Sequence, residues 1–213
     1  SGDHLLTLIN DVLDLSKIEA DRLELNPHDF DLTHLLKTME SMFGIRCHQK
    51  DIGWALYWEQ EDPLWVRGDE AKLKQILINL LDNAVKFTPK GEVSLHVTSD
   101  AEDRYSFQVM DTGPGISDPD HDRLFESFQQ GSAGVNHGGT GLGLTISRRH
   151  VELMGGELSL QSKAGEGTTF SFTLPLPRGK KGQSEIAAWT HVKHLAPGYH
   201  VRALIAEDVA ESR

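Results

Sequence analysis

The sequence contains a single cysteine, Cys47, among its 213 residues, which excludes an internal disulfide framework and favours a reducing compartment. No apolar run comes near the roughly 18 residues that a membrane-spanning helix needs. Basic residues are outnumbered, 21 against 32 acidic ones, and the net charge of −11 leaves no basic excess to neutralise the phosphates of nucleic acid or of an anionic membrane. We therefore expect a cytoplasmic protein that does not bind nucleic acid.

The overall amino-acid composition is typical of a globular protein, with 38% hydrophobic and 25% charged residues. A chain of this length can bury one sizeable core and carry a small accessory element. It begins with Ser-Gly, so we expect it to be part of a longer protein, in which any anchor in the inner membrane would lie upstream.

Residues 69–88 (DEAKLKQILINLLDNAVKFT) form the stretch around which we expect the chain to be organised. On a helix of about 3.6 residues per turn, its polar residues fall in a stripe roughly 100° wide, and apolar residues take most of the remaining surface. The stripe consists of Lys72, Gln75, Asn79, Asp82, Asn83 and Lys86. A helix this apolar should be buried over most of its circumference, so the stripe faces water, a cavity or a ligand. The periodicity alone leaves these alternatives open.

Hydrophobic patterns predict helices and strands along the rest of the chain. Asp69 should cap the central helix. Before it, we expect a coiled-coil-like helix over 3–25, and then a helix that is capped by Asp31 or Thr33 and runs to about residue 50. We also expect a short strand within 23–32 and strands over 52–60 and 64–67. After it, we expect strands over 92–98 and 105–110, helices over 120–128 and 140–154, and a hairpin of strands over 157–162 and 168–174. Residues 178–199 have the composition of a linker, and 200–205 that of a last short strand.

Three glycine-containing segments are candidate ligand loops: 111–116 (DTGPGI), 138–144 (GGTGLGL) and 165–170 (GEGTTF). Any one of them alone is most often a tight turn. The second matches no standard phosphate fingerprint, because no lysine follows it and its last glycines fall at 139, 141 and 143. It does open a predicted helix, where free N–H groups favour an anion. Asp111 ends a predicted strand and could accept a hydrogen bond from an amine such as that of adenine, or simply start a turn.

The order of these motifs resembles that of sensor histidine kinases. Residues 75–88 resemble the N box of that family, 111–116 its G1 box, 124–129 (LFESFQ) its F box, 138–146 its G2 box and 165–170 its last glycine box. The helix over 3–25 resembles the second helix of the dimerisation and histidine-phosphotransfer domain. The tail VRALIAEDVAESR resembles the start of a receiver domain, as in a hybrid kinase.

The resemblance implies an α+β fold of the Bergerat type: a two-layer α/β sandwich, with a mixed sheet covered by helices, preceded by one coiled-coil-like helix. It also implies four parts along the chain. These are the second helix of a dimerisation hairpin (1–24), the catalytic ATP-binding domain (25–177), a linker (178–199) and the start of a truncated receiver domain (200–213).

By the same resemblance, the site would bind ATP and Mg²⁺. Asn83 would coordinate the metal with Asn79 beside it, and Lys86 would contact phosphate, with Asn79 and Lys86 as the catalytic candidates. Asp111 would read the adenine amine, and Thr168 would close the adenine side. The other expected nucleotide contacts are Gly113, Gly115, Ile116, Phe128, Gly139, Thr140, Gly141, Leu142 and Gly143. The expected lid over 129–137 contains no Arg or Lys, so Lys86 would carry more of the phosphate charge.

The reaction implied is transfer of the ATP γ-phosphoryl group to a histidine of the dimerisation domain, and then to a receiver aspartate. None of His4, His28 or His34 sits in the acceptor context of the family, so the acceptor is expected upstream of Ser1. The expected partners are therefore ATP, the acceptor helix of the protein's own homodimer, and a receiver domain or response regulator.

Two other interpretations remain open. Another Bergerat-fold ATPase, of the gyrase, chaperone or mismatch-repair type, would carry a glutamate where this helix has Asn79. A degenerate nucleotide-binding scaffold is the second alternative, and the lack of a basic residue in the expected lid keeps it open.

Overall fold

The structure, a computed structural model, describes residues 23–60, 62–116 and 141–181. The chain divides into two compact units, Ser1–Lys181 and Gly182–Arg213, and all the described residues belong to the first. The helices expected over 3–25 and 120–128 and the strand expected over 200–205 lie wholly or almost wholly outside the described residues. Within the described ranges, no helix is long and apolar enough to span a bilayer.

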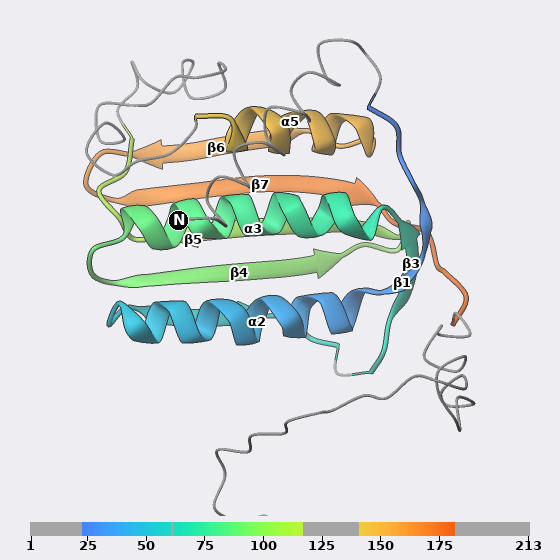
Figure 1. The fold of residues 1–213 in the computed structure, drawn as a ribbon, viewed down its shortest axis with the longest axis horizontal. Helices are drawn as coiled ribbons and strands as arrows, with labels where there is room; N and C mark the ends of the chain where they lie inside the picture. Colours follow the sequence, from blue (N-terminus) through green and yellow to red (C-terminus); the bar gives the residue numbers. More distant parts are fainter. Residues whose placement is uncertain (1–22, 61, 117–140, 182–213) are drawn as a thin grey trace, which may run out of the picture. The chain divides into compact units, whose positions relative to one another are not determined.

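A mixed sheet of five strands forms one layer of the domain (Figure 1). Its strand order is β2-β4-β5-β7-β6, in which β2 and β4 are parallel and the other neighbours are antiparallel. The strands are β2 (Gly53–Tyr57), β4 (Glu92–Ser99), β5 (Arg104–Asp111), β6 (Leu158–Lys163) and β7 (Gly167–Pro175). A separate antiparallel pair joins β1 (His28–Asp31) to β3 (Trp65–Gly68).

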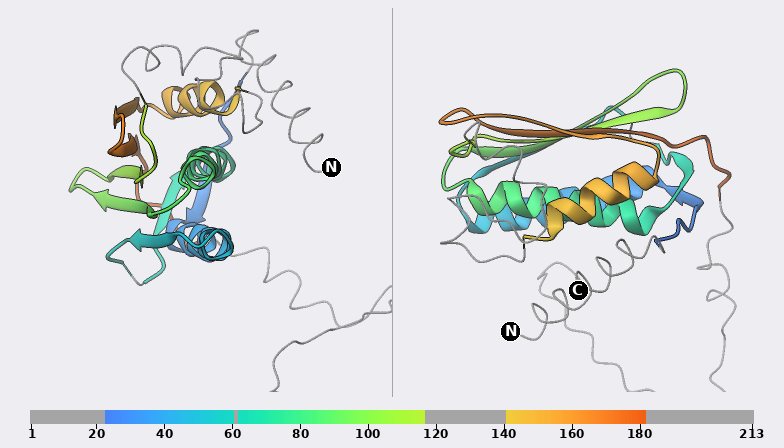
Figure 2. Two further views of the ribbon diagram at one scale, coloured as in Figure 1. Left: turned by 90° about the vertical axis from the view of Figure 1, so that its left-hand side faces the viewer. Right: turned by 90° about the horizontal axis from the view of Figure 1, so that it is seen from above.

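Three helices in the described part of the chain form the second layer, and all lie on the same face of the sheet (Figures 1 and 2). They are α2 (Leu32–Gln49), α3 (Glu70–Phe87) and α5 (Gly143–Leu153). The central helix α3 packs against both α2 and α5. The predicted α+β architecture, a mixed sheet covered by helices, is confirmed.

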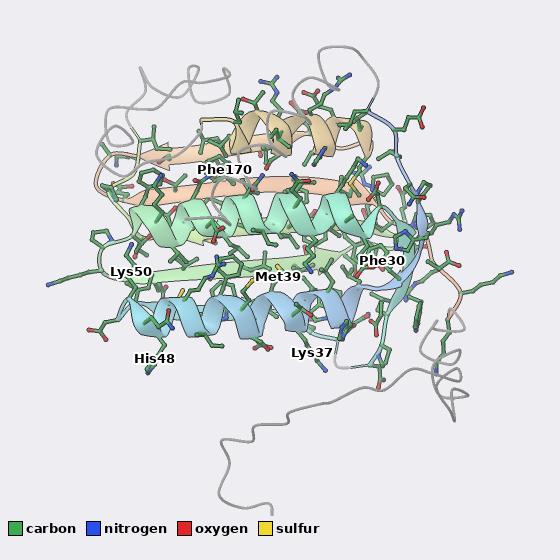
Figure 3. All side chains as sticks on the ribbon, in the orientation of Figure 1. Phe30, Lys37, Met39, His48, Lys50 and Phe170 are labelled. Carbon is green, nitrogen blue, oxygen red and sulfur yellow. The ribbon has the colours of Figure 1, made fainter. Side chains whose placement is uncertain are left out.

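The alternation of side chains along the strands explains why one face of the sheet carries the helices. In β4, Val93, Leu95 and Val97 are buried toward the helices, and in β5 Phe107 occupies the same layer. Its ring stacks on that of Phe172 from β7, with 4.9 Å between the ring centroids. Met39 of α2 and Phe170 of β7, both labelled in Figure 3, are also buried in this core. A fully buried apolar side chain of this size contributes about 2 kcal/mol to folding, so the core is the main stabilising feature.

The predicted helix starts are confirmed at two positions and corrected at a third. Asp31 caps α2, with its side chain accepting from the His34 N–H, and Asp69 caps α3 in the same way through Lys72. The helix expected to begin at residue 140 begins instead at Gly143. Gly141 has a φ of +71°, outside the range of a right-handed helix, so the helix cannot include this residue.

The chain remains bound to the domain after β7. The Gly179 N–H donates to the carbonyl oxygen of Trp65 across 2.9 Å, and Arg178 forms an ion pair with Asp103. The Lys180 N–H donates to the carboxylate of Asp29 across 3.3 Å. Contacts with the domain therefore extend past residue 177, where the sequence suggested that a linker begins.

Candidate functional site

The polar stripe predicted on α3 is present, and it is not an ordinary solvated face. Its members Lys72, Gln75, Asn79, Asp82, Asn83 and Lys86 are all half-buried. On the rest of the helix, six apolar residues between Leu73 and Ala84 are buried. The stripe lies on a helix with neighbours on both sides, which partly shield its amides and ammonium groups from water.

Asn79 connects the stripe to the start of α5. Its side-chain Nδ2 donates to the carbonyl oxygen of Gly143 and to the hydroxyl of Ser147, each across 3.3 Å. Ser147 is fully buried. Because a carbonyl can only accept, the nitrogen of the amide must face α5, which leaves the amide oxygen of Asn79 for another partner. The structure thus brings together Asn79 and Gly143, two residues that the sequence placed in one site.

Asn83 and Lys86 lie one and two turns further along the helix. The side chain of Asn83 makes no hydrogen bond to any residue in the described ranges, although it is half-buried. The ammonium group of Lys86 lies over the ring of Phe87, 4.9 Å from its centroid. Burial lowers the pKa of Lys86, because desolvation penalises its charged form. An anion bound beside Lys86 would offset that penalty.

Asp111 ends β5 at the opposite end of the site and organises a turn around its carboxylate. Its Oδ1 accepts from the Gly113 N–H across 2.9 Å, and the carboxylate also accepts from the backbone N–H of Thr168. Burial raises the pKa of Asp111, and these two hydrogen bonds oppose the rise. The predicted pair Asp111 and Thr168 is brought together by the pairing of β5 with β7, in which the two residues are direct partners.

Ser162 is a member of this turn that sequence reasoning missed. Its hydroxyl accepts from the Ile116 N–H across 2.9 Å, donates to the carbonyl oxygen of Gly167 across 2.8 Å, and lies 3.0 Å from the hydroxyl of Thr168. It holds the segment 111–116 against the β6–β7 hairpin. A serine in an alternating strand carries no local signal of such a role, so only the tertiary contact reveals it.

Two glycines are required where these segments meet. Gly115 has a φ of +67°, and a Cβ there would lie 2.0 Å from the carbonyl oxygen of Lys163. A Cβ on Gly113 would lie 2.8 Å from Asp111 Oδ1 and 2.9 Å from the carbonyl oxygen of Phe87, the last residue of α3. The end of α3, the loop after β5 and the hairpin therefore approach more closely than side chains would allow.

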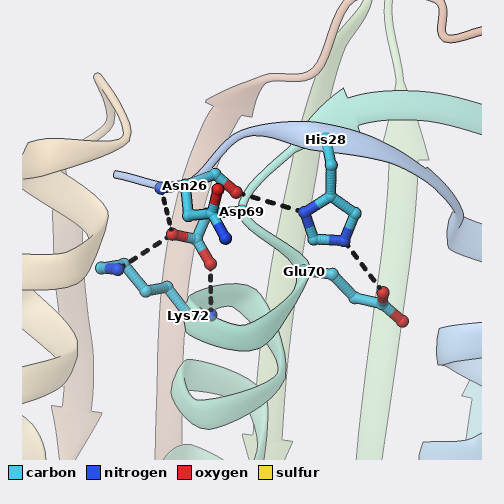
Figure 4. A network of polar contacts seen from close by, with 5 residues as sticks. All are labelled: Asn26, His28, Asp69, Glu70 and Lys72. Atoms are coloured by element: carbon cyan, nitrogen blue, oxygen red, sulfur yellow. Dashed lines mark hydrogen bonds and ion pairs between the residues drawn. The ribbon is translucent and has the colours of Figure 1, made fainter. Parts of the chain in front are cut away.

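The N-terminal end of α3 is fixed by a second polar network (Figure 4). The buried carboxylate of Asp69 accepts from the Asn26 N–H, from the Lys72 N–H and from the Lys72 ammonium group, at 2.9, 3.0 and 2.9 Å. Burial by itself would raise the pKa of Asp69, but these hydrogen bonds outweigh it and hold the pKa below its ordinary value. His28 and Glu70 add a contact of 3.4 Å at the surface. Asp69 therefore ties the segment that leads into the domain to the first turn of α3.

A cavity of about 570 Å³ opens on the other face of the sheet. Among the residues that line it are Ser94, His96 and Met110, which alternate along their strands with residues buried toward the helices. The ring of His96 stacks on that of Tyr57, with 4.1 Å between the centroids. Asp111, Ser162 and Thr168 also line this cavity, so it reaches the turn described above, whereas the α3 stripe lies on the helix side of the sheet.

The expected contacts at the end of the glycine-rich segment are only partly described. Gly141, Leu142 and Gly143 are described, and Leu142 is buried against Ile146. Phe128, Gly139 and Thr140 lie outside the described residues.

Residues 68–178, which include α3, β5 and the β6–β7 hairpin, match the family described as histidine kinase-, DNA gyrase B- and HSP90-like ATPase. The chain belongs to this family. The matched range holds every described residue that the sequence predicted as a nucleotide contact, and it covers more than half of the sequence. Within the family, the resemblance to sensor histidine kinases is confirmed by the relatives described next.

Two relatives with known names show the similarity. The autoinducer 2 sensor kinase/phosphatase LuxQ of Vibrio vulnificus is 35% identical over 215 residues, which cover 98% of this chain and 25% of LuxQ. The circadian input-output histidine kinase CikA of Synechococcus elongatus is 43% identical over 179 residues, which cover 82% of this chain and 24% of CikA. This chain therefore spans about a quarter of the length of these family members.

A solved structure shows the same fold. The full-length protein ShkA in complex with AMPPNP has a TM-score of 0.73 and 37% sequence identity, over 84% of this chain and 37% of that one. This chain therefore has the Bergerat fold, a mixed sheet covered by helices, which the resemblance of its motifs predicted.

Proposed function

We propose that this chain is the ATP-binding catalytic part of a protein-histidine kinase and supplies the γ-phosphoryl group for a histidine on another helix. The observation that carries the proposal is the contact between Asn79 and Gly143. It sets the polar stripe of α3 against the glycine-rich start of α5, while the Asp111 turn forms the other end of the same site. The family match and the AMPPNP complex of ShkA support the choice of ATP.

In this proposal the adenine end is formed by the Asp111 turn. The Asp111 carboxylate accepts a hydrogen bond from the adenine amine, and Thr168 closes that side. Gly113, Gly115 and Ile116 contribute backbone that can approach the base closely, because no side chain fits where these segments meet.

The phosphate end is formed by α3 and the start of α5. Lys86 neutralises phosphate charge and Asn79 presents its amide oxygen to the site, since its nitrogen is held by α5. The described end of the glycine-rich segment, Gly141, Leu142 and Gly143, contributes backbone N–H groups. Gly139, Thr140 and Phe128, which lie outside the described residues, are the further contacts that we propose on this side. Phosphoryl transfer depends mainly on such positioning and charge neutralisation.

The residues present also fit a magnesium ion bound together with the nucleotide. Asn83 has a half-buried amide with no hydrogen bond to the described residues, and its oxygen is a ligand that Mg²⁺ accepts. The described residues contain no group of three or more His, Cys, Asp and Glu that could hold a metal ion. Phosphate oxygens and water would therefore complete the coordination. When bound, the ion neutralises charge that develops on the phosphates.

The proposal extends to the longer protein. We propose that the acceptor histidine lies on a helix of its own homodimer, that the phosphoryl group passes on to a receiver aspartate, and that the chain works in the cytoplasm.

The interpretation as a hydrolase of the same family is less well supported, because the amide of Asn79 cannot take a proton from water. A nucleotide-binding scaffold without transfer remains the second candidate.

The test uses a longer chain that includes the upstream acceptor helix. Incubated with γ-labelled ATP and Mg²⁺, this protein should become labelled, and the label should be lost in acid and kept in base, as expected for phosphohistidine. Acid-stable label, or phosphate release without labelled protein, would overturn the kinase assignment. Binding of ATP without any turnover would indicate the scaffold.

A further inference from the structure

The C-terminal end of α3 has carbonyl groups that need partners from outside the helix. The last four carbonyls of any α-helix have no intrahelical N–H. The carbonyl oxygen of Ala84 accepts from the N–H and the hydroxyl of Thr88, at 3.1 and 2.7 Å. Those of Val85 and Lys86, which come next, cannot be reached by this cap.

Lys50 provides the missing donors. Its ammonium group donates to the carbonyl oxygens of Val85 and Lys86, at 2.5 and 2.9 Å. Helices α2 and α3 run side by side in the same direction, so their last turns meet (Figure 1). Lys50 lies directly after α2, and Figure 3 shows it at the end of that helix opposite to Lys37. A positive charge at the C-terminus of α3 also complements the helix dipole.

The backbone of Lys50 is itself held in place. Its N–H donates to the carbonyl oxygens of Arg46 and Cys47, at 3.2 and 3.0 Å, which closes the last turn of α2. One turn earlier, Arg46 forms an ion pair with Asp82 of α3. The end of α2 therefore contacts the end of α3 in two successive turns, through Lys50 and through Arg46.

This end of α3 carries the groups assigned to phosphate and metal. Lys86 belongs to the turn whose carbonyls Lys50 binds, and Asn83 lies one turn before it. The next carbonyl, that of Phe87, packs closely on Gly113, since a Cβ added to this glycine would lie 2.9 Å from its oxygen. A shift of this last turn would therefore move the phosphate contacts and the adenine loop together.

We propose that Lys50 is a positioning residue for nucleotide binding, which acts by holding the last turn of α3 and thereby placing Lys86 and Asn83. It does not itself contact the nucleotide. This inference rests on the proposed function, since it assumes that the nucleotide binds at this end of α3. The same residue would otherwise be a surface lysine of small energetic value.

The experiment measures binding of AMPPNP with Mg²⁺ by calorimetry on the whole chain. Lys50→Met removes both donors and should raise the Kd about fivefold, the size of effect expected for a residue that acts through others. Lys50→Arg can still donate to both carbonyls and should restore a Kd close to that of the wild type. Lys90→Gln is the matched control, because Lys90 is an exposed lysine three residues after α3 with no polar contact in the described ranges. It removes the same charge without removing a helix contact and should leave the Kd unchanged.

Melting temperatures of the same variants identify a loss caused by unfolding. Lys50 is exposed, so the melting temperature of Lys50→Met should stay close to that of Lys90→Gln. A Kd for Lys50→Met equal to that of Lys90→Gln, or a raised Kd that Lys50→Arg fails to restore, overturns the inference. If the wild-type chain does not bind AMPPNP at all, the proposed function fails instead.

Discussion

The side-chain amide of Asn79 donates to the carbonyl oxygen of Gly143, 64 residues later in the chain, across 3.3 Å. This single contact joins the central helix to the helix that follows the glycine-rich segment. It also fixes which end of the amide faces the site, because the carbonyl of Gly143 can only accept. The orientation of a catalytic candidate thus depends on the backbone of another element.

Replacing Asn79 should therefore affect both binding and the start of α5. Asn79→Ala leaves the Gly143 carbonyl and the Ser147 hydroxyl without this donor and removes an oxygen from the site. We expect nucleotide affinity to fall about tenfold, the usual consequence of a lost hydrogen bond to a buried group. Amide exchange should become faster over residues 143–147. Lys74→Ala, on the exposed side of the same helix, is the control and should change neither quantity.

Replacing Asn83 should affect the metal and leave folding almost unchanged. Its amide makes no hydrogen bond to the described residues, so Asn83→Ala should alter the free energy of unfolding by less than about 1 kcal/mol. Wild-type affinity for ATP should fall when Mg²⁺ is removed by a chelator, whereas the affinity of the variant should be low both with and without Mg²⁺. A collapse of the melting temperature, with unchanged binding per folded molecule, would show that Asn83 is structural.

The raised pKa of Asp111 predicts opposite pH dependences for binding and for stability. The carboxylate accepts from the adenine amine in our proposal, so affinity should fall as the pH decreases through the raised pKa of Asp111. Stability changes the other way. Because the pKa is higher in the folded than in the unfolded state, the contribution of Asp111 to stability is fully present below the unfolded pKa and is lost as the pH rises through the folded pKa. Calorimetric binding and urea unfolding across the acidic range, compared with Asp111→Asn, should show both trends in the wild type and neither in the variant.

Asp69 should contribute to stability in the opposite pH range. Its pKa is held below the ordinary value, so its contribution is present above the unfolded pKa of about 3.9 and is lost as the pH falls through the folded pKa. Asp69→Ala leaves the Asn26 N–H and the Lys72 ammonium group without this partner, and should lower the free energy of unfolding at neutral pH by about 3 kcal/mol. The matched control is Asp31→Ala, which removes the more exposed cap of α2 and should cost about 1 kcal/mol. Equal losses in urea unfolding would show that Asp69 acts only as a helix cap.

Alanine substitutions at two glycines with positive φ should distinguish the cost of backbone strain from the cost of a steric clash. Gly165 has a φ of +86°, and a Cβ added there would meet nothing within 4 Å, so Gly165→Ala should cost about 1 to 2 kcal/mol of stability. Gly115→Ala meets the same strain and also places its Cβ 2.0 Å from the carbonyl oxygen of Lys163. We expect a loss of about 3 kcal/mol or more, together with weaker nucleotide binding. Similar melting temperatures for the two variants would contradict the close packing of the loop after β5 on the hairpin.

Much of the secondary structure followed from local patterns. The length of α3, its cap at Asp69 and its polar stripe all depend on residues that are near one another in the sequence, and the structure confirms them. The strands β4 and β5 follow from strict alternation, which determines the face that is buried. The start of α5 was misplaced because the left-handed conformation of Gly141 is a property of the backbone that glycine permits but does not require.

By itself, the sequence determined the elements, the order of the motifs and hence the family, because helical and strand periods, caps and glycine positions are local properties. Only the tertiary structure decided which groups meet: Asn79 with Gly143, Asp69 with Asn26, and Lys50 with the end of α3. The physical reason is that these hydrogen bonds join residues far apart in the chain. Their geometry is fixed by the packing of three helices on one sheet, and no local pattern encodes that packing.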